Sequence, residues 1–346
     1  MDSTYIGAYG HIKALYSDLI KKDDLDSLDS AEGKEFISRL SSTSYKREID
    51  EFYSTYGDED IVEIAVNSHF IRTANKALMM LPPIGKDLIK SYLRKIDIQN
   101  IKLVLAAKLL GKAMELKDRF LTIDKGFPLG SESPLISNED YINMINQRTP
   151  LDVINYLTNF GYGRVLLRFS ASAELSRDVS GMALALDVDY YSELLEKFMF
   201  YNGDEGPVLR FIQGIIDVRN IMTLIKAIEL KTPVSGLLLD GGSIKKESLA
   251  EKANLSIDQL ARETPFDIRS ANELYQNDGL IANFEVEMMK QLHERYLAAF
   301  RSGGASLGSI LGFIISAEME KNSIRLKWFK KYYKLDKELI NAGYGI

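Results

Sequence analysis

The chain has 346 residues, a net charge of −6 and no cysteine. Its length favours two or three domains, and its hydrophobic and charged fractions, 46% and 27%, are those of a folded globular protein. The negative charge argues against a nucleic-acid partner, and the missing cysteines exclude disulfides, thiolate metal sites and cysteine nucleophiles.

The first residues, Met1 to Tyr5, include an acid and lack the basic and then apolar pattern of a secretory leader, so we expect the chain to stay inside the cell. The run from Lys22 to Asp29 is rich in aspartate and is similar to the carboxylate clusters that hold magnesium in helical prenyl-transferring enzymes. Its spacing differs from theirs and no second cluster accompanies it, so we interpret it as a solvated linker. A magnesium-dependent helical enzyme stays open as the less favoured alternative.

Helical periodicity dominates the chain. Apolar residues recur at three- and four-residue steps between Asp60 and Leu81, which predicts a helix with one buried stripe. The segment from Ile98 to Gly111 is rich in strong helix formers and ends in glycine, a common helix stop, so another helix is expected there. Alternating patterns typical of strands are short and scattered, the nearest being Gly163 to Arg168. The fold class is therefore predicted to be all-α.

Glycine, serine and proline gather in two stretches, residues 125–138 and 232–243, which are typical of linkers. These stretches divide the chain into three pieces of about 110 to 120 residues, a common domain size. The sequence therefore predicts three helical repeats, at residues 1–120, 121–235 and 236–346.

Three short markers occur in the same order in each predicted repeat. The first is a threonine able to cap and so open a helix, at Thr43, Thr149 and Thr264. The second is a glutamate followed by two apolar residues, at Glu63, Glu193 and Glu287. The third is an acid three residues before a polar residue and isoleucine, at Asp97–Ile101, Asp217–Ile221 and Glu320–Ile324. The shared order predicts an internal triplication, and the longer middle spacing predicts an insertion near residues 169–182.

The segment from Ser306 to Ala317 is apolar over about a dozen residues, against roughly 20 for a bilayer crossing, so it predicts a buried helix. Overlapping the start of this segment, Gly304 to Gly308 fits the G-x-S-x-G nucleophile elbow, but a helical pattern precedes this motif and no histidine follows it. His293 begins a motif like H-E-x-x-H but has Leu297 in the second ligand position, and no phosphate-binding loop occurs. We therefore expect no catalytic, metal-binding or cofactor-binding residues.

The C-terminal stretch from Lys321 to Lys337 mixes cations and aromatics at helical spacing, which predicts a basic amphipathic helix. The commoner arrangement turns the aromatic side chains, such as Trp328, inward and leaves the charges in solvent. The same charged face can also meet an acidic protein or lipid headgroups. The candidate partner-binding residues are Arg325, Lys327, Lys330 and Lys331.

Four stretches, together with the triplication, carry a resemblance to a known family: Tyr9–Leu15, Asp97–Gly111, Asp217–Lys231 and Glu318–Arg325. They resemble the C subunit of the archaeal-type (A/V-type) rotary ATPases, which is similar to the d subunit of vacuolar ATPases. The resemblance extends over nearly the whole chain. It departs from the family at Lys330–Tyr333, where a glycine is often found.

The resemblance implies three pseudo-symmetric helical domains arranged as a funnel. It implies a non-catalytic central-stalk adaptor without cofactors, coupling the rotating shaft to the membrane proteolipid ring during proton or sodium ion transport and ATP synthesis or hydrolysis. The implied partners are the shaft subunits and that ring, and the implied location is peripheral, on the cytoplasmic side of the cell membrane. A soluble helical scaffold for other proteins is the main alternative, although repeats of about 110 residues exceed the 20 to 45 of usual solenoid units.

Overall fold

The computed structural model describes residues 5–117, 119–123, 133, 135–169, 180–200, 206–234 and 236–332. The chain is mostly helical, with 76% helix and 2% strand, which confirms the predicted all-α class. Most of the predicted insertion, and most of the first predicted linker, lie outside the described residues. None of the helices in the described ranges combines the length and apolar character that a bilayer crossing requires.

The element order repeats, because short helices come first each time and long helices follow. The long helices are α5 (Ile61–Met79), α6 (Pro83–Leu93), α7 (Lys95–Leu109), α12 (Ser180–Met199), α13 (Gly206–Leu230), α17 (Ala282–Ser302) and α18 (Leu307–Tyr332). The short α-helices are α1 (Ile6–Leu15), α2 (Lys22–Ser27), α3 (Gly33–Leu40), α4 (Lys46–Phe52), α8 (Asn138–Asn146), α9 (Pro150–Leu157), α10 (Gly163–Leu166), α14 (Lys246–Ala250), α15 (Ile257–Glu263) and α16 (Arg269–Asp278).

Short 3₁₀ turns and one hairpin complete the described structure. The 3₁₀ turns are η2 (Tyr16–Asp18), η3 (Leu28–Ser30), η4 (Thr158–Phe160), η5 (Leu167–Phe169) and η6 (Glu251–Asn254). The hairpin follows α7 and consists of β1 (Met114–Lys117) and β2 (Phe120–Ile123), which pair antiparallel with Met114 opposite Ile123. The sequence patterns did not predict this hairpin.

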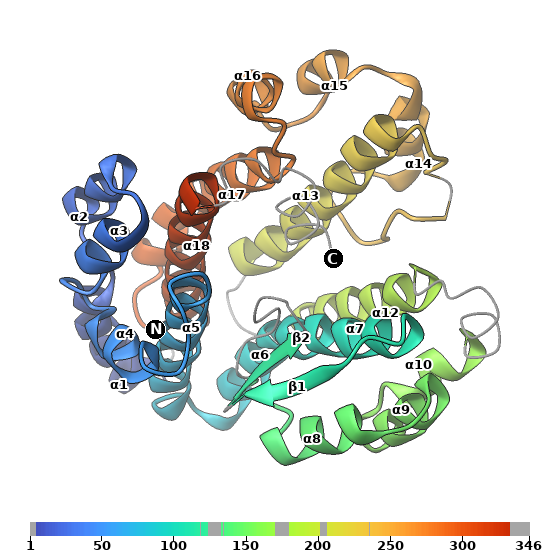
Figure 1. Cartoon of the computed structure of the whole chain (residues 1–346). Helices are drawn as coiled ribbons and strands as arrows, with labels where there is room; N and C mark the ends of the chain where they lie inside the picture. The colour runs from blue at the N-terminus through green and yellow to red at the C-terminus, as the bar shows by residue number, and fades with distance from the viewer. Residues whose placement is uncertain are drawn as a thin grey trace.

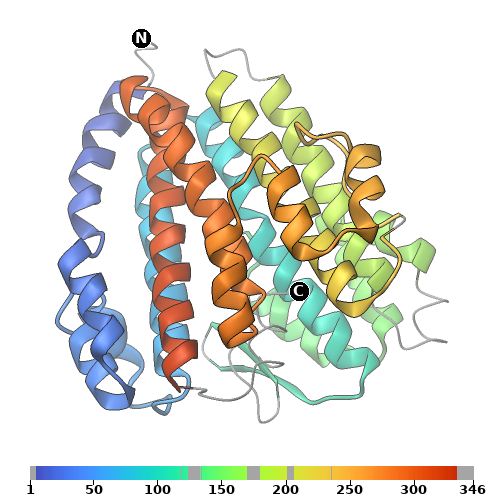
Figure 2. The same cartoon turned by 90° about the horizontal axis from the view of Figure 1, so that it is seen from above.

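The long helices follow one another around a ring, with the short helices outside them (Figure 1). Helix α12 packs against α6 and α7 on one side and against α13 on the other, and α13 packs against α17. Helix α18 packs against both α17 and α5, so the last long helix meets the first. Figure 2 shows many of these helices running side by side. The ring is therefore closed by contacts between the two ends of the chain.

Close helix packing in this ring depends on small residues at two crossings. A Cβ atom on Gly214 of α13 would lie 2.4 Å from Leu292 Cδ1 of α17, and one on Gly312 of α18 would lie 3.1 Å from Phe300 of α17. A side chain at Gly214 would require the flexible end of Leu292 to move, and one at Gly312 would require Phe300 to shift by a few tenths of an ångström. The apolar stretch predicted from Ser306 to Ala317 forms the buried first half of α18, as expected.

Local signals in the sequence explain several helix boundaries. Thr149 caps α9, and its side chain and that of Asp152 each accept a bond from the other's backbone N–H, as predicted for a helix-opening threonine. Gly111, with φ of 65°, ends α7, where the Lys112 N–H bonds to the Ala107 carbonyl at 2.9 Å. The predicted glycine stop is therefore confirmed.

Two of the three predicted threonine caps are wrong. Helix α4 begins at Lys46 without a side-chain cap, and the Thr43 hydroxyl instead donates to the Leu40 carbonyl at 2.6 Å. Thr264 follows the end of α15, and the next helix begins only at Arg269. The backbone of Thr264 is extended, as a cap requires, but no helical turn follows it directly, so the residue type by itself does not open a helix.

The third sequence marker places a buried acid on a long helix, in the first turn of α7 at Asp97 and farther along α13 and α18 at Asp217 and Glu320. Each acid accepts hydrogen bonds from another segment of the chain. On α7, the Asp97 carboxylate accepts a hydrogen bond from Tyr141 Oη of α8 at 2.9 Å. On α13, the Asp217 carboxylate accepts bonds from the backbone N–H groups of Ser243 and Ile244 at 3.1 and 3.0 Å. We call each buried acid, with the segment that it holds, a joint.

The Glu320 joint on α18 is the third and differs in what it holds. Its carboxylate accepts bonds from the Ile20 N–H at 2.8 Å and from Tyr45 Oη at 2.7 Å. These partners precede Glu320 by 300 and 275 residues. The Glu320 joint therefore ties the C-terminal helix to the N-terminal segment and helps to close the ring.

Candidate functional site

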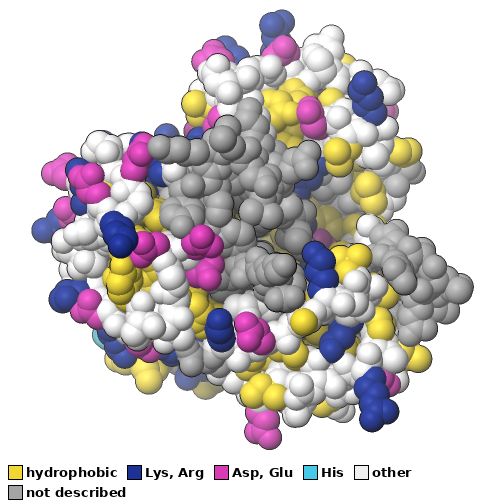
Figure 3. All heavy atoms as spheres, in the orientation of Figure 1, with side chains coloured by type: hydrophobic (Ala, Val, Ile, Leu, Met, Phe, Trp, Pro, Cys, Tyr) yellow, Lys and Arg dark blue, Asp and Glu magenta, His cyan; other side chains and the backbone are white. Residues whose placement is uncertain are grey.

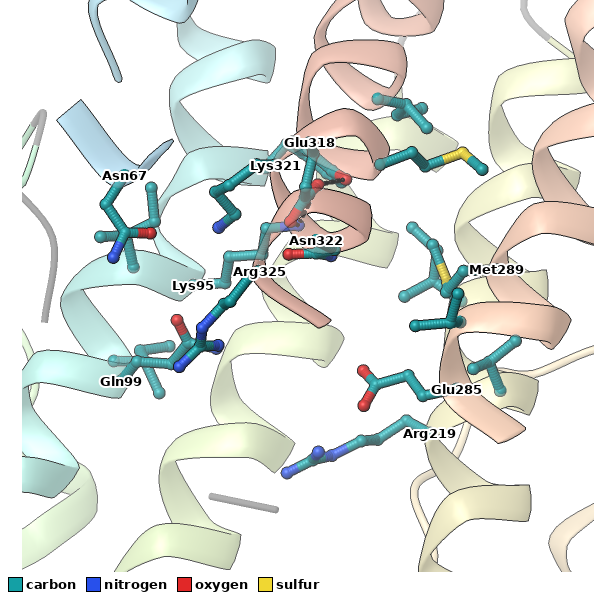
Figure 4. A pocket seen from close by; sticks show the side chains of 18 of the residues that line it. Asn67, Lys95, Gln99, Arg219, Glu285, Met289, Glu318, Lys321, Asn322 and Arg325 are labelled. Carbon is teal, nitrogen blue, oxygen red and sulfur yellow. Dashed lines mark hydrogen bonds and ion pairs between the residues drawn. The ribbon is translucent and has the colours of Figure 1, made fainter. Parts of the chain in front are cut away.

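A cavity of about 290 Å³ lies within the ring of long helices. Residues of α5, α6, α7, α12, α13, α17 and α18 line it. Figure 4 shows charged and amide side chains from α5, α7, α13, α17 and α18 around one shared space. On the described part of the face shown in Figure 3, acidic, basic and hydrophobic side chains are interspersed. The cavity is therefore the candidate functional site.

Helix periodicity explains why polar side chains face the cavity from helices that are otherwise apolar. On α18 the lining residues Glu318, Asn322 and Arg325 are spaced by four and three residues, and on α7 Lys95 and Lys102 are seven apart. Residues at these spacings share one helix face. The remaining faces carry the buried apolar residues that pack against neighbouring helices.

Charged pairs connect α18 to the first long helices. Lys95 Nζ lies 2.5 Å from Glu318 Oε1, and Tyr92 Oη donates to the same carboxylate at 2.6 Å. Arg325 Nε donates to the buried Glu63 carboxylate of α5 at 2.6 Å. Burial works to raise the pKa of Glu318, but the positive charges of Lys95 and Lys321 outweigh it and hold this pKa below its usual value. The Glu318 carboxylate is therefore ionised near neutral pH.

Lys321 of α18 extends into the same part of the cavity (Figure 4). Its ammonium group lies 4.9 Å from the centre of the Phe70 ring. Burial lowers the pKa of Lys321 to about 8; the charge of Glu318 opposes this change, and Arg325 adds to it. The Lys321 ammonium therefore loses its proton at a lower pH than an ordinary lysine does.

A second charged group lies between α7, α12 and α13. Lys102 Nζ and Arg219 Nη2 approach the Asp187 carboxylate at 2.6 and 3.3 Å. Burial, followed by the charge of Arg219, lowers the pKa of the neighbouring Lys226 to about 8, while Glu285 opposes the change. Two cationic side chains thus share one acid across three helices.

The four candidate partner-binding residues all lie on α18, but the structure does not bring them together at one site. Arg325 lines the cavity and pairs with Glu63, and Lys327 pairs with Asp29 of η3. Lys330 lies 3.2 Å from Asp278 of α16, and Lys331 is half-buried. Three of the four cations therefore bind acids within the chain and hold α18 against its neighbours. A role for these residues in partner binding stays a prediction.

The aromatic side of this C-terminal helix faces inward, as expected for an amphipathic helix. Trp328 is fully buried, and its ring centre lies 5.2 Å from that of Phe36 on α3. Phe329 is also buried. These side chains pack the end of α18 against the N-terminal short helices, so the only tryptophan of the chain reports on this contact.

The aspartate-rich run from Lys22 to Asp29 forms α2 and the start of η3 rather than the expected linker. Helical hydrogen bonds override the high charge of this run, which lies mostly in solvent. Within the described ranges, no group of three or more histidine, cysteine, aspartate or glutamate side chains is arranged to hold a metal ion.

The sequence patterns missed most of the residues that line the cavity, including Lys95, Lys102, Asp187, Arg219 and Glu285. The only available signal was the recurrence of charges at helical spacing inside strongly apolar helices. That signal marks a polar helix face, but it does not show that several such faces meet.

The fold and the cavity define a class of protein: a closed ring of long helices around a charged centre. A sequence model of the family described as ATP synthase (C/AC39) subunit matches residues 8–343. The chain therefore belongs to the ATP synthase (C/AC39) subunit family, as the resemblance predicted. Members of this family are accessory, non-catalytic subunits, so the expectation that the chain is not an enzyme is also confirmed.

Curated relatives agree with this assignment. The chain is 35% identical to the A-type ATP synthase C subunit of Thermoplasma volcanium over 98% of both proteins. It is 32% identical to the protein of that name from Thermoplasma acidophilum, over 99% of this chain and 98% of the relative. With the Methanocaldococcus jannaschii protein the identity is 24%, over 86% of this chain and 75% of the relative.

Proposed function

We propose that this chain is the C subunit of an A-type rotary ATPase and acts as a non-catalytic adaptor of its central stalk. In this role it transmits torque between the rotating shaft and the membrane proteolipid ring. The supporting observation is the closed ring of long helices, in which a hydrogen bond from the Ile20 N–H to the Glu320 carboxylate joins the two ends of the chain. Packed helices have low compressibility, so rotation applied at one face reaches the other with little elastic loss.

The proposal includes three pseudo-symmetric helical domains, at residues 1–120, 121–235 and 236–346, arranged as a funnel. The repeated order of short and long helices and the recurrence of the joint support this arrangement. The central cavity would open toward the shaft, and the opposite face would contact the proteolipid ring. The subunit would then be peripheral, on the cytoplasmic side of the membrane, and would serve proton or sodium ion transport.

Membranes that contain the complete ATPase test this proposal. We expect the chain to remain on washed membranes together with the ATP-hydrolysing head, and to bind purified shaft subunits and purified proteolipid rings. Complexes assembled without the chain should hydrolyse ATP but pump no ions. If the purified chain does not bind the shaft, or does not bind the ring, the adaptor function is wrong.

A further inference from the structure

Among the described residues that line the cavity, basic side chains outnumber acidic ones, although the whole chain has a net charge of −6. The basic lining residues are Lys95, Lys102, Arg219, Lys290, Lys321 and Arg325, and the acidic ones are Glu63, Asp187, Glu285 and Glu318. Most of the cations pair with these acids. Lys290 and Lys321 do not pair with any acid of the described residues, so the lining has an excess of positive charge.

Of these two cations, Lys321 carries the larger free-energy cost of burial. Its ammonium contacts the face of Phe70, and the charged groups around it are Glu318 and Arg325 on its own helix, Lys95 on α7 and Glu63 on α5. Both acids are already paired, with Lys95 and with Arg325. A partly buried ammonium that has no carboxylate partner of its own is strongly stabilised when a carboxylate binds beside it.

Lys290 offers a second contact on an adjacent wall of the same cavity. It lies on α17, which packs against α18, and its side chain is exposed to solvent. A cavity of about 290 Å³ with two cations that have no acid partner among the described residues fits inserted side chains better than a whole folded element. Metal ions are disfavoured by the same positive charge, and an apolar ligand would leave both ammonium groups unpaired.

We propose that acidic side chains at the end of the rotating shaft enter this cavity and form ion pairs with Lys321 and Lys290. This inference rests on the proposed adaptor function and adds the chemistry by which the shaft is recognised. Carboxylates in these positions would complete the charge balance of the lining. Electrostatic pairing of this kind also speeds the encounter of the two proteins and fixes their orientation.

Calorimetric titration of the whole chain with the purified shaft subunit tests the inference at low and high salt. We expect Lys321→Gln and Lys290→Gln each to weaken binding by about 5- to 10-fold at low salt, and to reduce its salt dependence, because each removes one charge pair. Lys321→Arg should bind nearly as well as the unchanged chain. Lys34→Gln serves as the matched control, since that side chain is 82% exposed on α3 and does not line the cavity.

The proton balance of binding gives a second measurement, which a merely structural role of Lys321 would not change. A carboxylate beside Lys321 raises its pKa from about 8, so the complex should take up a fraction of a proton at pH 8. Titrations in buffers with different ionisation enthalpies should detect this uptake. We expect it to disappear in Lys321→Gln and to persist in Lys290→Gln, which alters an exposed residue and should fold normally.

The outcomes separate this inference from the adaptor function. If the shaft binds with the same affinity, salt dependence and proton uptake in all variants, the cavity charges do not recognise it and the inference is wrong, while the adaptor function stands. If inorganic phosphate binds at the two lysines but the variants do not affect the shaft, the site is for a small anion and the inference is again wrong. If the unchanged chain does not bind the shaft, both proposals fail.

Discussion

The Asp97 and Asp217 joints occupy the same position of a repeated pattern, but their two buried carboxylates accept different sets of hydrogen bonds. Both oxygens of Asp217 accept backbone N–H groups, Oδ2 from Ser243 and Oδ1 from Ile244. At Asp97 one oxygen accepts the bonds from Tyr141 and Ser133, and Oδ2 accepts none from the described residues. A sequence pattern thus fixes where an acid is buried, while the surrounding donors decide whether its charge is satisfied.

The Glu320 joint extends this comparison, because it bridges the two ends of the chain instead of neighbouring segments. Closing such a long loop costs more conformational entropy than closing the short loops at Asp97 and Asp217. Its hydrogen bonds therefore form between segments that only the complete tertiary structure brings together. Substitutions at the three joints should therefore change the free energy of unfolding by different amounts and, in one case, in the opposite direction.

Glu320→Ala should have the largest effect. The change leaves the Ile20 N–H and the Tyr45 hydroxyl without their acceptor in a buried site, so we expect a loss of about 3 kcal/mol in the free energy of unfolding. Urea unfolding followed by Trp328 fluorescence measures it, because this tryptophan lies in the contact between α18 and the N-terminal helices. Glu196→Ala, at an exposed position of α12, is the control. Equal midpoints for both variants would contradict a closing role for Glu320.

Asp217→Asn should destabilise the protein by about 2 kcal/mol, because one amide group would replace an oxygen that now faces a backbone donor. The disturbance should be local to the segment after Leu239. Hydrogen exchange at Ser243 and Ile244 should therefore accelerate more than exchange in α18. Unchanged protection of these two amides would show that the Asp217 joint does not hold its segment.

Asp97→Asn should act in the opposite direction and stabilise the protein at pH 7 by about 1 to 2 kcal/mol. Burial raises the pKa of Asp97 from 3.8 to about 6. The folded chain therefore binds a proton more tightly than the unfolded chain, so this contribution is complete below about pH 4 and is lost as the pH rises through 6. Unfolding measured from pH 4 to 7 should show a smaller loss of stability in Asp97→Asn. An unaltered pH profile would mean that Asp97 is already ionised at low cost.

The first marker provides the smallest expected difference. Thr149→Ala removes a cap and should cost about 1 kcal/mol. Thr43→Ala removes a hydroxyl that donates to the Leu40 carbonyl and accepts a long 3.4 Å bond from the Tyr45 N–H, and it should change stability by less than about 0.5 kcal/mol. Thermal unfolding of the two variants, side by side, measures this difference. Equal losses would indicate that Thr43 has a structural role beyond capping.

The sequence predicted the elements whose structure depends on their own residues. The helix at α5, the glycine stop of α7 and the buried first half of α18 are local properties, and the structure confirms them. The single buried stripe predicted for α5 is wrong, because every residue from Ile61 to Ile71 is buried where α1, α4 and α18 pack around this helix. The cap at Thr149 was also predictable, because its partner Asp152 lies only three residues away. Thr264 shows the limit of such patterns, since the residue type alone did not reveal that a helix ends there.

The composition and periodicity of the chain by themselves determined that it forms buried, mostly apolar helices with an acid at a repeated position. Only the tertiary structure decided that their polar faces meet at one cavity and that α18 closes the ring on α5. The physical reason is the sequence distance of the contacts: Arg325 meets Glu63 across 262 residues. Such a pair forms when packing brings both helices together, and no local pattern contains that information.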